Sequence, residues 1–397
     1  MLVVPRASEA RRLSASRYAE ITLPTASAAP AAMAAIDPQR TGRSTARLPA
    51  STPRVVWSAP ANATYGTSAV VAADGTIYVG TGDGVAALAP DGRQLWMSPL
   101  LGAATTPAIT TDGDVAVTTL DGQLCIVSPA GTVRTRVALR GAPTSPPLRR
   151  PGMRTPLRTR APSMLVLFAA PLPLADGAIV GGIPATGLHV LTPEGESSPL
   201  LAGAETSYAV PAMTLDGMLL VTSRRGGSVL AIRPDPEDPS PEHWRADVEE
   251  TFGATLIATP DGGAAVMLAD GHLVRLRPGG AVAWRTSFGV PAGGAAMAAD
   301  GSYRVLLNGG ALVSVAADGS ERWRTTFGAN AWIAPLLDAD GVTLVADSDT
   351  PTLVAIDAAG HDRWRVHLGQ AAGGRPVLGA DGTIYLPDTG GVLHALR

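Results

Sequence analysis

Asp74–Trp96 has the sequence DGTIYVGTGDGVAALAPDGRQLW. Short runs of β-branched, aromatic and small apolar residues alternate in this stretch with three Asp-Gly pairs, which begin at Asp74, Asp83 and Asp91. Asp and Gly favour hairpin turns because both tolerate the positive φ that such turns need. The stretch and the apolar run before it predict four short antiparallel strands, over 69–71, 76–79 and 85–88, with a fourth that ends at Trp96.

The same Asp-Gly signal recurs along the chain. Six of the seven spacings between successive pairs lie between 38 and 45 residues, and the seventh, of 64 residues, contains an insertion. Four-stranded units of about 40 residues are typical of propeller blades, which bury little surface alone and stack on their neighbours. We therefore predict an all-β chain that forms an eight-bladed β-propeller of four-stranded antiparallel blades over residues 54–397. The pairs begin at Asp74, Asp112, Asp176, Asp216, Asp261, Asp300, Asp340 and Asp381.

The last strand of the unit repeatedly carries a tryptophan. A tryptophan that recurs in this way predicts a wedge between adjacent blades, since a single ligand site would not need one in every repeat. The second and third units lack it and have Val137 and Leu200 nearby. The recurring residues are Trp96, Trp244, Trp284, Trp323 and Trp364.

The two ends of the repeat array complement each other. The eighth unit stops after its third strand, at Arg397, whereas Arg54–Trp57 lies before the first unit and resembles a fourth strand with its tryptophan. We predict that this N-terminal strand completes the last blade, because closure of the ring removes exposed strand edges.

These units resemble the pyrroloquinoline-quinone (PQQ) repeat over about residues 54–397. The residues that match are Asp74–Val79, Asp91-Gly92 and Trp96, and in the last unit Asp381–Tyr385 and Leu393–Leu396. Upstream, Asp37–Arg43 (DPQRTGR) resembles the lead-in of bacterial proteins of this family. Among its members, the outer-membrane assembly protein BamB is similar in length and blade number. The resemblance implies a protein of the bacterial periplasm or cell envelope.

Two activities are compatible with PQQ-like repeats, which occur in dehydrogenases and in non-catalytic proteins. Dehydrogenases of this type hold PQQ beside calcium and often stack a disulfide of adjacent cysteines on the cofactor. The single cysteine, Cys125, cannot form such a disulfide, and its apolar neighbours predict a buried thiol in a strand. The six histidines have no metal-binding spacing. No catalytic, cofactor-binding or metal-binding residue stands out.

Our first hypothesis is therefore a non-catalytic, monomeric binding scaffold without a cofactor, whose partner is a protein or an anionic envelope component. A PQQ-dependent quinoprotein oxidoreductase that uses PQQ and calcium is the first alternative, which Glu, Asn and Asp clustered around the channel would favour. A ligand- or carbohydrate-binding sensor propeller is the second, which an aromatic-lined pocket would favour. The net charge of −3 does not indicate nucleic acid as a partner.

The N-terminal 50 residues are expected to be a disordered leader or an export signal. Arg11 and Arg12 precede a mildly apolar, Ala-rich stretch that two prolines interrupt. Neither a clear signal peptide nor a lipid-attachment cysteine precedes the repeats, so a cytoplasmic location stays open. No apolar run reaches the roughly 18 residues of a transmembrane helix.

Two features outside the repeat pattern are candidate binding elements. The insertion at about 139–162 is rich in Arg, Pro and Gly and has no acidic residue, which predicts an irregular basic loop. Such a loop either binds an anionic partner or is a solvated insertion without a binding role. Its candidate residues are Arg140, Arg149, Arg150, Arg154, Arg158 and Arg160. Trp332 falls outside the repeated tryptophan position, just before a first strand. It is a candidate aromatic residue at the channel mouth, and the alternative is a packing role.

Overall fold

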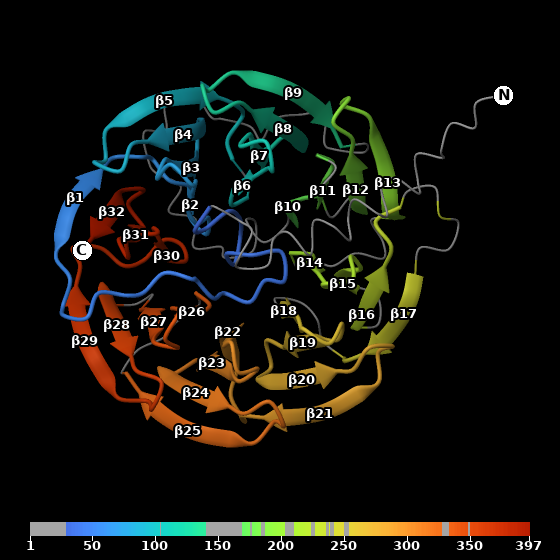
Figure 1. The fold of residues 1–397 in the computed structure, drawn as a ribbon, viewed down its shortest axis with the longest axis vertical. Helices are drawn as coiled ribbons and strands as arrows, with labels where there is room; N and C mark the ends of the chain where they lie inside the picture. The colour runs from blue at the N-terminus through green and yellow to red at the C-terminus, as the bar shows by residue number, and fades with distance from the viewer. Residues whose placement is uncertain are drawn as a thin grey trace, which may run out of the picture.

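The structure is a computed structural model. Its strands group into eight four-stranded antiparallel sheets arranged as the blades of a ring (Figure 1). The predicted eight-bladed β-propeller is thereby confirmed. No helix in the described part of the chain is long and apolar enough to cross a membrane. The structure describes residues 29–103, 105–139, 169–174, 177–183, 187–202, 210–223, 227–235, 238, 242–249, 254–327, 333–347 and 350–397.

The strands of each blade follow one another from the channel outward, and hydrogen bonds join neighbours in that order. Blades 1 to 4 contain β2 (Val70–Val71), β3 (Ile77–Thr81), β4 (Gly84–Leu88), β5 (Gln94–Pro99), β6 (Ala108–Ile109), β7 (Val115–Thr118), β8 (Gln123–Val127), β9 (Val133–Ala138), β10 (Ala169–Pro173), β11 (Ile179–Ile183), β12 (Gly187–Leu191), β13 (Ser197–Ala202), β14 (Ala212–Met213), β15 (Leu219–Ser223), β16 (Ser228–Ile232) and β17 (Glu242–Asp247).

Blades 5 to 8 have the same arrangement, except that the outermost strand of blade 8 comes from the N-terminal side. They contain β18 (Thr255–Ala258), β19 (Ala264–Met267), β20 (His272–Leu276), β21 (Val282–Ser287), β22 (Ala292–Met297), β23 (Tyr303–Leu307), β24 (Ala311–Val315), β25 (Glu321–Thr326), β26 (Leu336–Leu337), β27 (Thr343–Ala346), β28 (Thr352–Ile356), β29 (Asp362–His367), β30 (Val377–Leu378), β31 (Ile384–Pro387), β32 (Leu393–Leu396) and β1 (Val55–Ala59).

The first turn of each blade has the predicted chemistry. In all eight Asp-Gly pairs the glycine has a φ between 76° and 85°. In four of these turns the aspartate carboxylate accepts a hydrogen bond from the backbone N–H two residues later, as Asp74 does from Thr76 at 2.9 Å and Asp300 from Ser302 at 3.0 Å. This local bond fixes the turn that reverses the chain between the two innermost strands.

Burial follows the position of a strand within its blade. In blade 1 every residue of β3 and β4 is buried, whereas β5 is partly exposed, because the middle strands are covered on both faces by neighbouring blades. Cys125 in β8 is buried as predicted, and burial raises the pKa of its thiol to about 11. The prediction that the fourth strand ends at Trp96 is wrong, since β5 continues to Pro99 in register with Gly84.

The recurring tryptophans join adjacent blades, as predicted. In four cases the indole Nε1 donates to a backbone carbonyl of the next blade. A Cβ on the glycine of that turn would lie within 3 Å of the ring, as at Gly92, Gly131, Gly319 and Gly360. Blade 2 has Thr135 at the tryptophan position, two residues before Val137. The donor and acceptor pairs are Trp57–Pro90, Trp96–Pro129, Trp284–Ala317 and Trp323–Ala358, at 2.8 to 2.9 Å.

The ring is closed by β1, which pairs antiparallel with β32. Arg54 and Arg397 exchange two backbone hydrogen bonds at 2.8 and 2.9 Å, so the predicted completion of blade 8 by the N-terminal strand is confirmed. Blade 8 therefore has no turn between its third and fourth strands that could receive the tryptophan of blade 7. Trp364 donates instead to the carbonyl of Pro49, at 2.9 Å, in the chain that leads into β1.

Candidate functional site in the central channel

The chain that precedes β1 passes through the centre of the ring, where Figure 1 shows it in blue. We call residues 29–50 the channel segment. Backbone N–H groups on the innermost strands of six blades donate hydrogen bonds to its carbonyls, at distances from 2.7 to 2.9 Å. The innermost strands would otherwise leave edge groups unpaired, so the channel segment satisfies them. The pairs are Val71–Ala31, Ile109–Ala32, Met213–Pro38, Ala258–Gln39, Met297–Thr41 and Leu337–Gly42.

The channel segment falls within the N-terminal 50 residues for which we expected a leader or an export signal. Residues 29–50 contact the blades, and Ala31 and Met33 are buried. Residues 1–28 lie outside the described residues, and the expectation for them stays a prediction.

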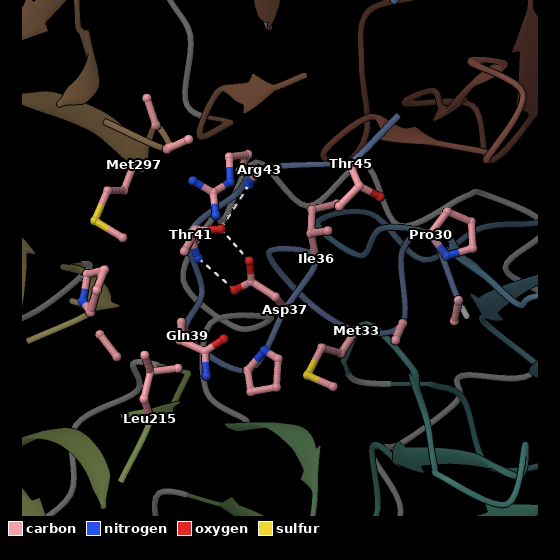
Figure 2. Close-up of a pocket in the computed structure, with 17 residues that line it drawn as sticks. Pro30, Met33, Ile36, Asp37, Gln39, Thr41, Arg43, Thr45, Leu215 and Met297 are labelled. Carbon is pink, nitrogen blue, oxygen red and sulfur yellow. Dashed lines mark hydrogen bonds between the residues drawn. The ribbon is translucent and has the colours of Figure 1, made fainter. Parts of the chain in front are cut away.

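A compact turn in the channel segment is built on Asp37. Its carboxylate accepts hydrogen bonds from the backbone N–H of Thr41, at 2.9 Å, and from the Thr41 hydroxyl (Figure 2). The Thr41 hydroxyl also accepts a bond from the N–H of Arg43, at 3.2 Å. Desolvation deep within the ring raises the pKa of Asp37, while the bonds from Thr41 and the charges of Arg43 and Arg40 oppose this rise.

Three arginines interact with this carboxylate. Arg40 is buried and donates from Nε to the carbonyl of Pro211, at 2.9 Å. Arg375, just before β30, donates to the carbonyls of Ala334 and Pro335 at 3.1 and 2.6 Å, and burial lowers its pKa to about 10. Its guanidinium lies against Gly42, whose φ is +69° and where a Cβ would come within 2.6 Å of Nη2. Gly42 therefore allows the channel segment to pass over Arg375.

Arg43 differs from the other two arginines. It is half-buried and lines a cavity, and within the described residues its guanidinium has no hydrogen-bond acceptor or ion-pair partner. With Asp37 ionised, this part of the channel combines one carboxylate with three guanidinium groups. The local charge is therefore positive.

The cavity beside Arg43 has a volume of about 150 Å³ and lies between the channel segment and blades 4 to 6 (Figure 2). Five of its lining residues are polar or charged, and the others are apolar or proline. Three lining residues, Thr45, Pro260 and Ala299, are exposed, so the cavity reaches solvent there. The polar residues are Asp37, Gln39, Thr41, Arg43 and Thr45.

The candidate binding residues named from the sequence cannot be placed. Trp332 and the arginines at 140, 149, 150, 154, 158 and 160 lie outside the described residues, and their predicted roles stay predictions. The described chain on either side of the insertion ends with β9 and resumes with β10, which places the insertion between blades 2 and 3. Arg43 and Asp37 belong to the DPQRTGR stretch, whose resemblance to the lead-in of family members indicated no binding role for either residue.

Two observations on the described residues bear on the alternatives. No group of three or more His, Cys, Asp or Glu side chains with a metal-binding arrangement occurs among residues 29–397 outside the gaps stated above. None of the residues that line the channel cavity is aromatic. Neither observation favours the oxidoreductase or the carbohydrate sensor.

A second polar cluster, which the sequence analysis missed, lies across the ring closure. The Ser58 hydroxyl and Nδ1 of His394 are 2.8 Å apart, and Nε2 of His394 is 2.9 Å from the Asp388 carboxylate. Asp388 is buried and also accepts hydrogen bonds from the N–H groups of Gly390 and Val392. The cluster links β1, β32 and the turn before β32, and so supports closure of the ring.

Comparisons with known proteins agree with this architecture. The chain matches the family described as outer membrane protein assembly factor BamB over residues 40–167 and 269–397, about two thirds of its length. The match begins within the channel segment and includes the last blade. A comparison with curated proteins finds no match.

Three solved structures illustrate the range of proteins with this fold. BamB from Moraxella catarrhalis has a TM-score of 0.63 at 14% identity, with 87% of this chain and 98% of that chain covered. A europium-containing methanol dehydrogenase has 0.65 at 14%, with 93% and 90% covered. The quinohemoprotein alcohol dehydrogenase from Comamonas testosteroni has 0.69 at 12%, with 98% and 84% covered. At such identities the likeness shows the fold alone.

Proposed function

The chain belongs to the PQQ-repeat propeller family described as outer membrane protein assembly factor BamB, and from this premise we propose that it is a non-catalytic binding scaffold. Its partner is a protein or an anionic component of the bacterial cell envelope, and its location is the periplasm or the envelope. It acts as a single propeller without a cofactor.

One observation carries this proposal. The centre of the ring, where a cofactor would be enclosed by all eight blades, is crossed by the channel segment, which is hydrogen-bonded to six of them. The faces and the rim of the propeller are then the surfaces that remain for recognition. Such surfaces suit a macromolecular partner, which needs roughly 800 Å² on each side of an interface.

A quinoprotein oxidoreductase is the second candidate, because two of the structurally similar proteins are dehydrogenases. The channel cavity argues against it. A volume of about 150 Å³ is that of a site for one benzene ring, whereas PQQ has three fused rings and three carboxyl groups. The residues of this cavity therefore do not fit the cofactor.

Calorimetric titration with PQQ and calcium, together with a dye-coupled alcohol oxidation assay, separates the two candidates. The scaffold proposal expects neither binding nor turnover. Binding of PQQ at micromolar or lower concentration, accompanied by dye reduction, would replace it with the oxidoreductase.

The role of the basic insertion is tested with anionic vesicles. We expect the protein to co-sediment with phosphatidylglycerol vesicles at low salt, and to lose most of this binding when the six arginines of the insertion are replaced by Gln. Equal binding by the six-Gln variant would rule the insertion out as the anionic contact. A matched control replaces six exposed arginines elsewhere, Arg47, Arg54, Arg93, Arg277, Arg322 and Arg363.

A further inference from the structure

The cavity beside Arg43 has the composition of a binding site for a small organic anion. Its charged and polar residues belong to the channel segment, and Figure 2 shows Asp37, Thr41 and Arg43 close together. Apolar side chains from the blades, Leu215 and Met297, lie on other sides of the same cavity. A ligand here would meet one cationic group and an apolar wall.

The Arg43 guanidinium interacts with Asp37 only through its charge, without a direct ion pair or hydrogen bond within the described residues. Arg40 and Arg375 donate to backbone carbonyls, but the guanidinium of Arg43 has no such acceptor in the described part of the chain. A guanidinium withdrawn from bulk water without acceptors is costly, so this position favours an oxyanion that accepts two parallel N–H bonds. Arg43 also lines the cavity directly, within reach of a ligand in it.

Desolvation limits the charge of that oxyanion. Asp37 lines the same cavity, so a ligand bound to Arg43 faces a carboxylate as well as a guanidinium. Moving a dianion such as phosphate from water into this small, largely apolar cavity costs more than moving a monoanion, because the desolvation cost of an ion rises steeply with its charge. The cavity therefore favours a ligand with one negative charge.

The volume and the apolar wall define the rest of the ligand. A cavity of about 150 Å³ accommodates about six non-hydrogen atoms, as benzene does in a cavity of that size. Met33, Ile36 and Met297 provide apolar surface for a short hydrocarbon chain. We propose that the channel binds a short-chain monocarboxylate, with its carboxylate on Arg43 and its hydrocarbon chain against the methionines.

The ligand has a route into this site from solvent. Ala299 and Pro260 line the cavity, are exposed, and belong to the first turns of blades 6 and 5. Entry there does not require displacement of the channel segment. A bulky residue at position 299 should close this route without disturbing the core, because Ala299 already contacts solvent.

Calorimetric titration with n-butyrate tests the proposal, with inorganic phosphate as the competing anion. Butyrate should saturate a single site with a dissociation constant of about 1 mM or tighter. Arg43→Gln should weaken binding at least about tenfold, since a charge-assisted hydrogen bond contributes about 1.5 to 3 kcal/mol. Arg47→Gln, which changes an exposed arginine of the same segment, should alter affinity less than about twofold.

Two further variants keep the test decisive if Arg43→Gln fails to fold. Arg43→Lys retains the charge but not the planar fork, and should bind butyrate more weakly than the wild type. Ala299→Phe should weaken binding, because it narrows the opening at Ala299, while the melting temperature without ligand stays unchanged. The proposal is overturned if butyrate does not saturate, if phosphate binds as tightly, or if the folded variants bind butyrate like the wild type.

Discussion

The interface between blades 1 and 2 and the interface between blades 2 and 3 have the same design but different contents. In the first, Trp96 lies on Gly131 and donates to the carbonyl of Pro129 at 2.8 Å. In the second, Thr135 takes the place of the tryptophan, and its Cγ2 is 3.5 Å from where a Cβ on Gly195 would lie. Both glycines keep a positive φ, +84° and +89°.

This difference separates two roles of the repeat. In blades 2 and 3 the glycine lies in the turn that reverses the chain between the third and fourth strands. The tryptophan, where it is present, packs on this turn of the next blade and strengthens the contact between the two blades. Blade 2 keeps the first role and lacks the second, and the Arg-rich insertion follows directly after it.

Truncation of the central side chain of each interface should give the largest difference in the free energy of unfolding. Trp96→Ala should destabilise the protein by about 3 kcal/mol, because it removes a large packed ring and leaves a cavity. Thr135→Ala should cost less than about 1 kcal/mol. Urea unfolding followed by far-ultraviolet circular dichroism measures both. Equal effects would show that the tryptophan does not strengthen its interface.

The glycines beneath these side chains provide a second comparison. Gly131→Ala should destabilise by about 1 to 3 kcal/mol more than Gly195→Ala, since a Cβ at 131 would lie 2.7 Å from the Trp96 ring and overpacking costs that much. Because their φ values are similar, the backbone strain cancels in the difference. Melting temperatures of the two variants, measured in the same buffer, report it. A smaller loss for Gly131→Ala than for Gly195→Ala would contradict the packing argument.

Installing the missing side chain should reduce the difference between the interfaces. Thr135→Trp places an indole above Gly195, and we expect it to stabilise the protein by about 1 kcal/mol. The matched control is Thr135→Leu, which adds apolar volume without an indole N–H. A rise in melting temperature for the tryptophan variant alone would support the docking geometry. A fall for both variants would mean that blades 2 and 3 lie too close for the ring.

The smallest expected effect concerns acid stability and compares blade 2 with blade 6. Burial raises the pKa of Asp114 in blade 2 despite its ion pair with Arg134 at 3.0 Å. Asp300 in blade 6 behaves in the opposite way. Desolvation raises its pKa, but hydrogen bonds from Ser302 and Arg322 outweigh this and hold the pKa well below the usual value of 3.8.

The two carboxylates should therefore change the stability of the protein in opposite directions as the pH falls. Asp300 contributes stability above pH 3.8 that is lost as the pH falls towards its lower folded pKa, whereas Asp114 contributes stability as the pH falls through its raised pKa. Asp300→Asn should reduce the loss of stability on acidification, and Asp114→Asn should increase it. Solvent screening keeps each effect below about 1 kcal/mol. Melting temperatures between pH 6 and about pH 3 test these signs, and a shared sign would refute the assignment.

Much of the fold is predictable because its determinants are local and repeated. An Asp-Gly pair specifies a turn from two adjacent residues, and eight repeats of it specify a ring. The recurrence of tryptophan identifies the wedge, and the missing fourth strand of blade 8 identifies β1 as its closure. The end of β5 was misplaced because the tryptophan lies within its strand, where pairing continues to Pro99.

The candidate site could not be predicted from local and repeated signals of this kind. The channel segment has no periodic pattern in its sequence. Its backbone carbonyls accept hydrogen bonds from six blades, and the donor residues lie between about 40 and 295 positions further along the chain. Arg43 and Asp37 are one charged pair among many in the sequence. Only their place beside Leu215 and Met297, which come from blades 4 and 6, makes them parts of one cavity.

The amino-acid sequence by itself determined the blades, their number and the closure of the ring, because turns and strand pairing depend on neighbours within one repeat. The tertiary structure alone decided that the channel segment passes through the ring, that Pro49 receives Trp364, and that Arg43 faces a cavity. These contacts join segments that are distant in the sequence, and their partners are backbone groups that every residue carries. Side-chain identity therefore does not reveal them before the chain is folded.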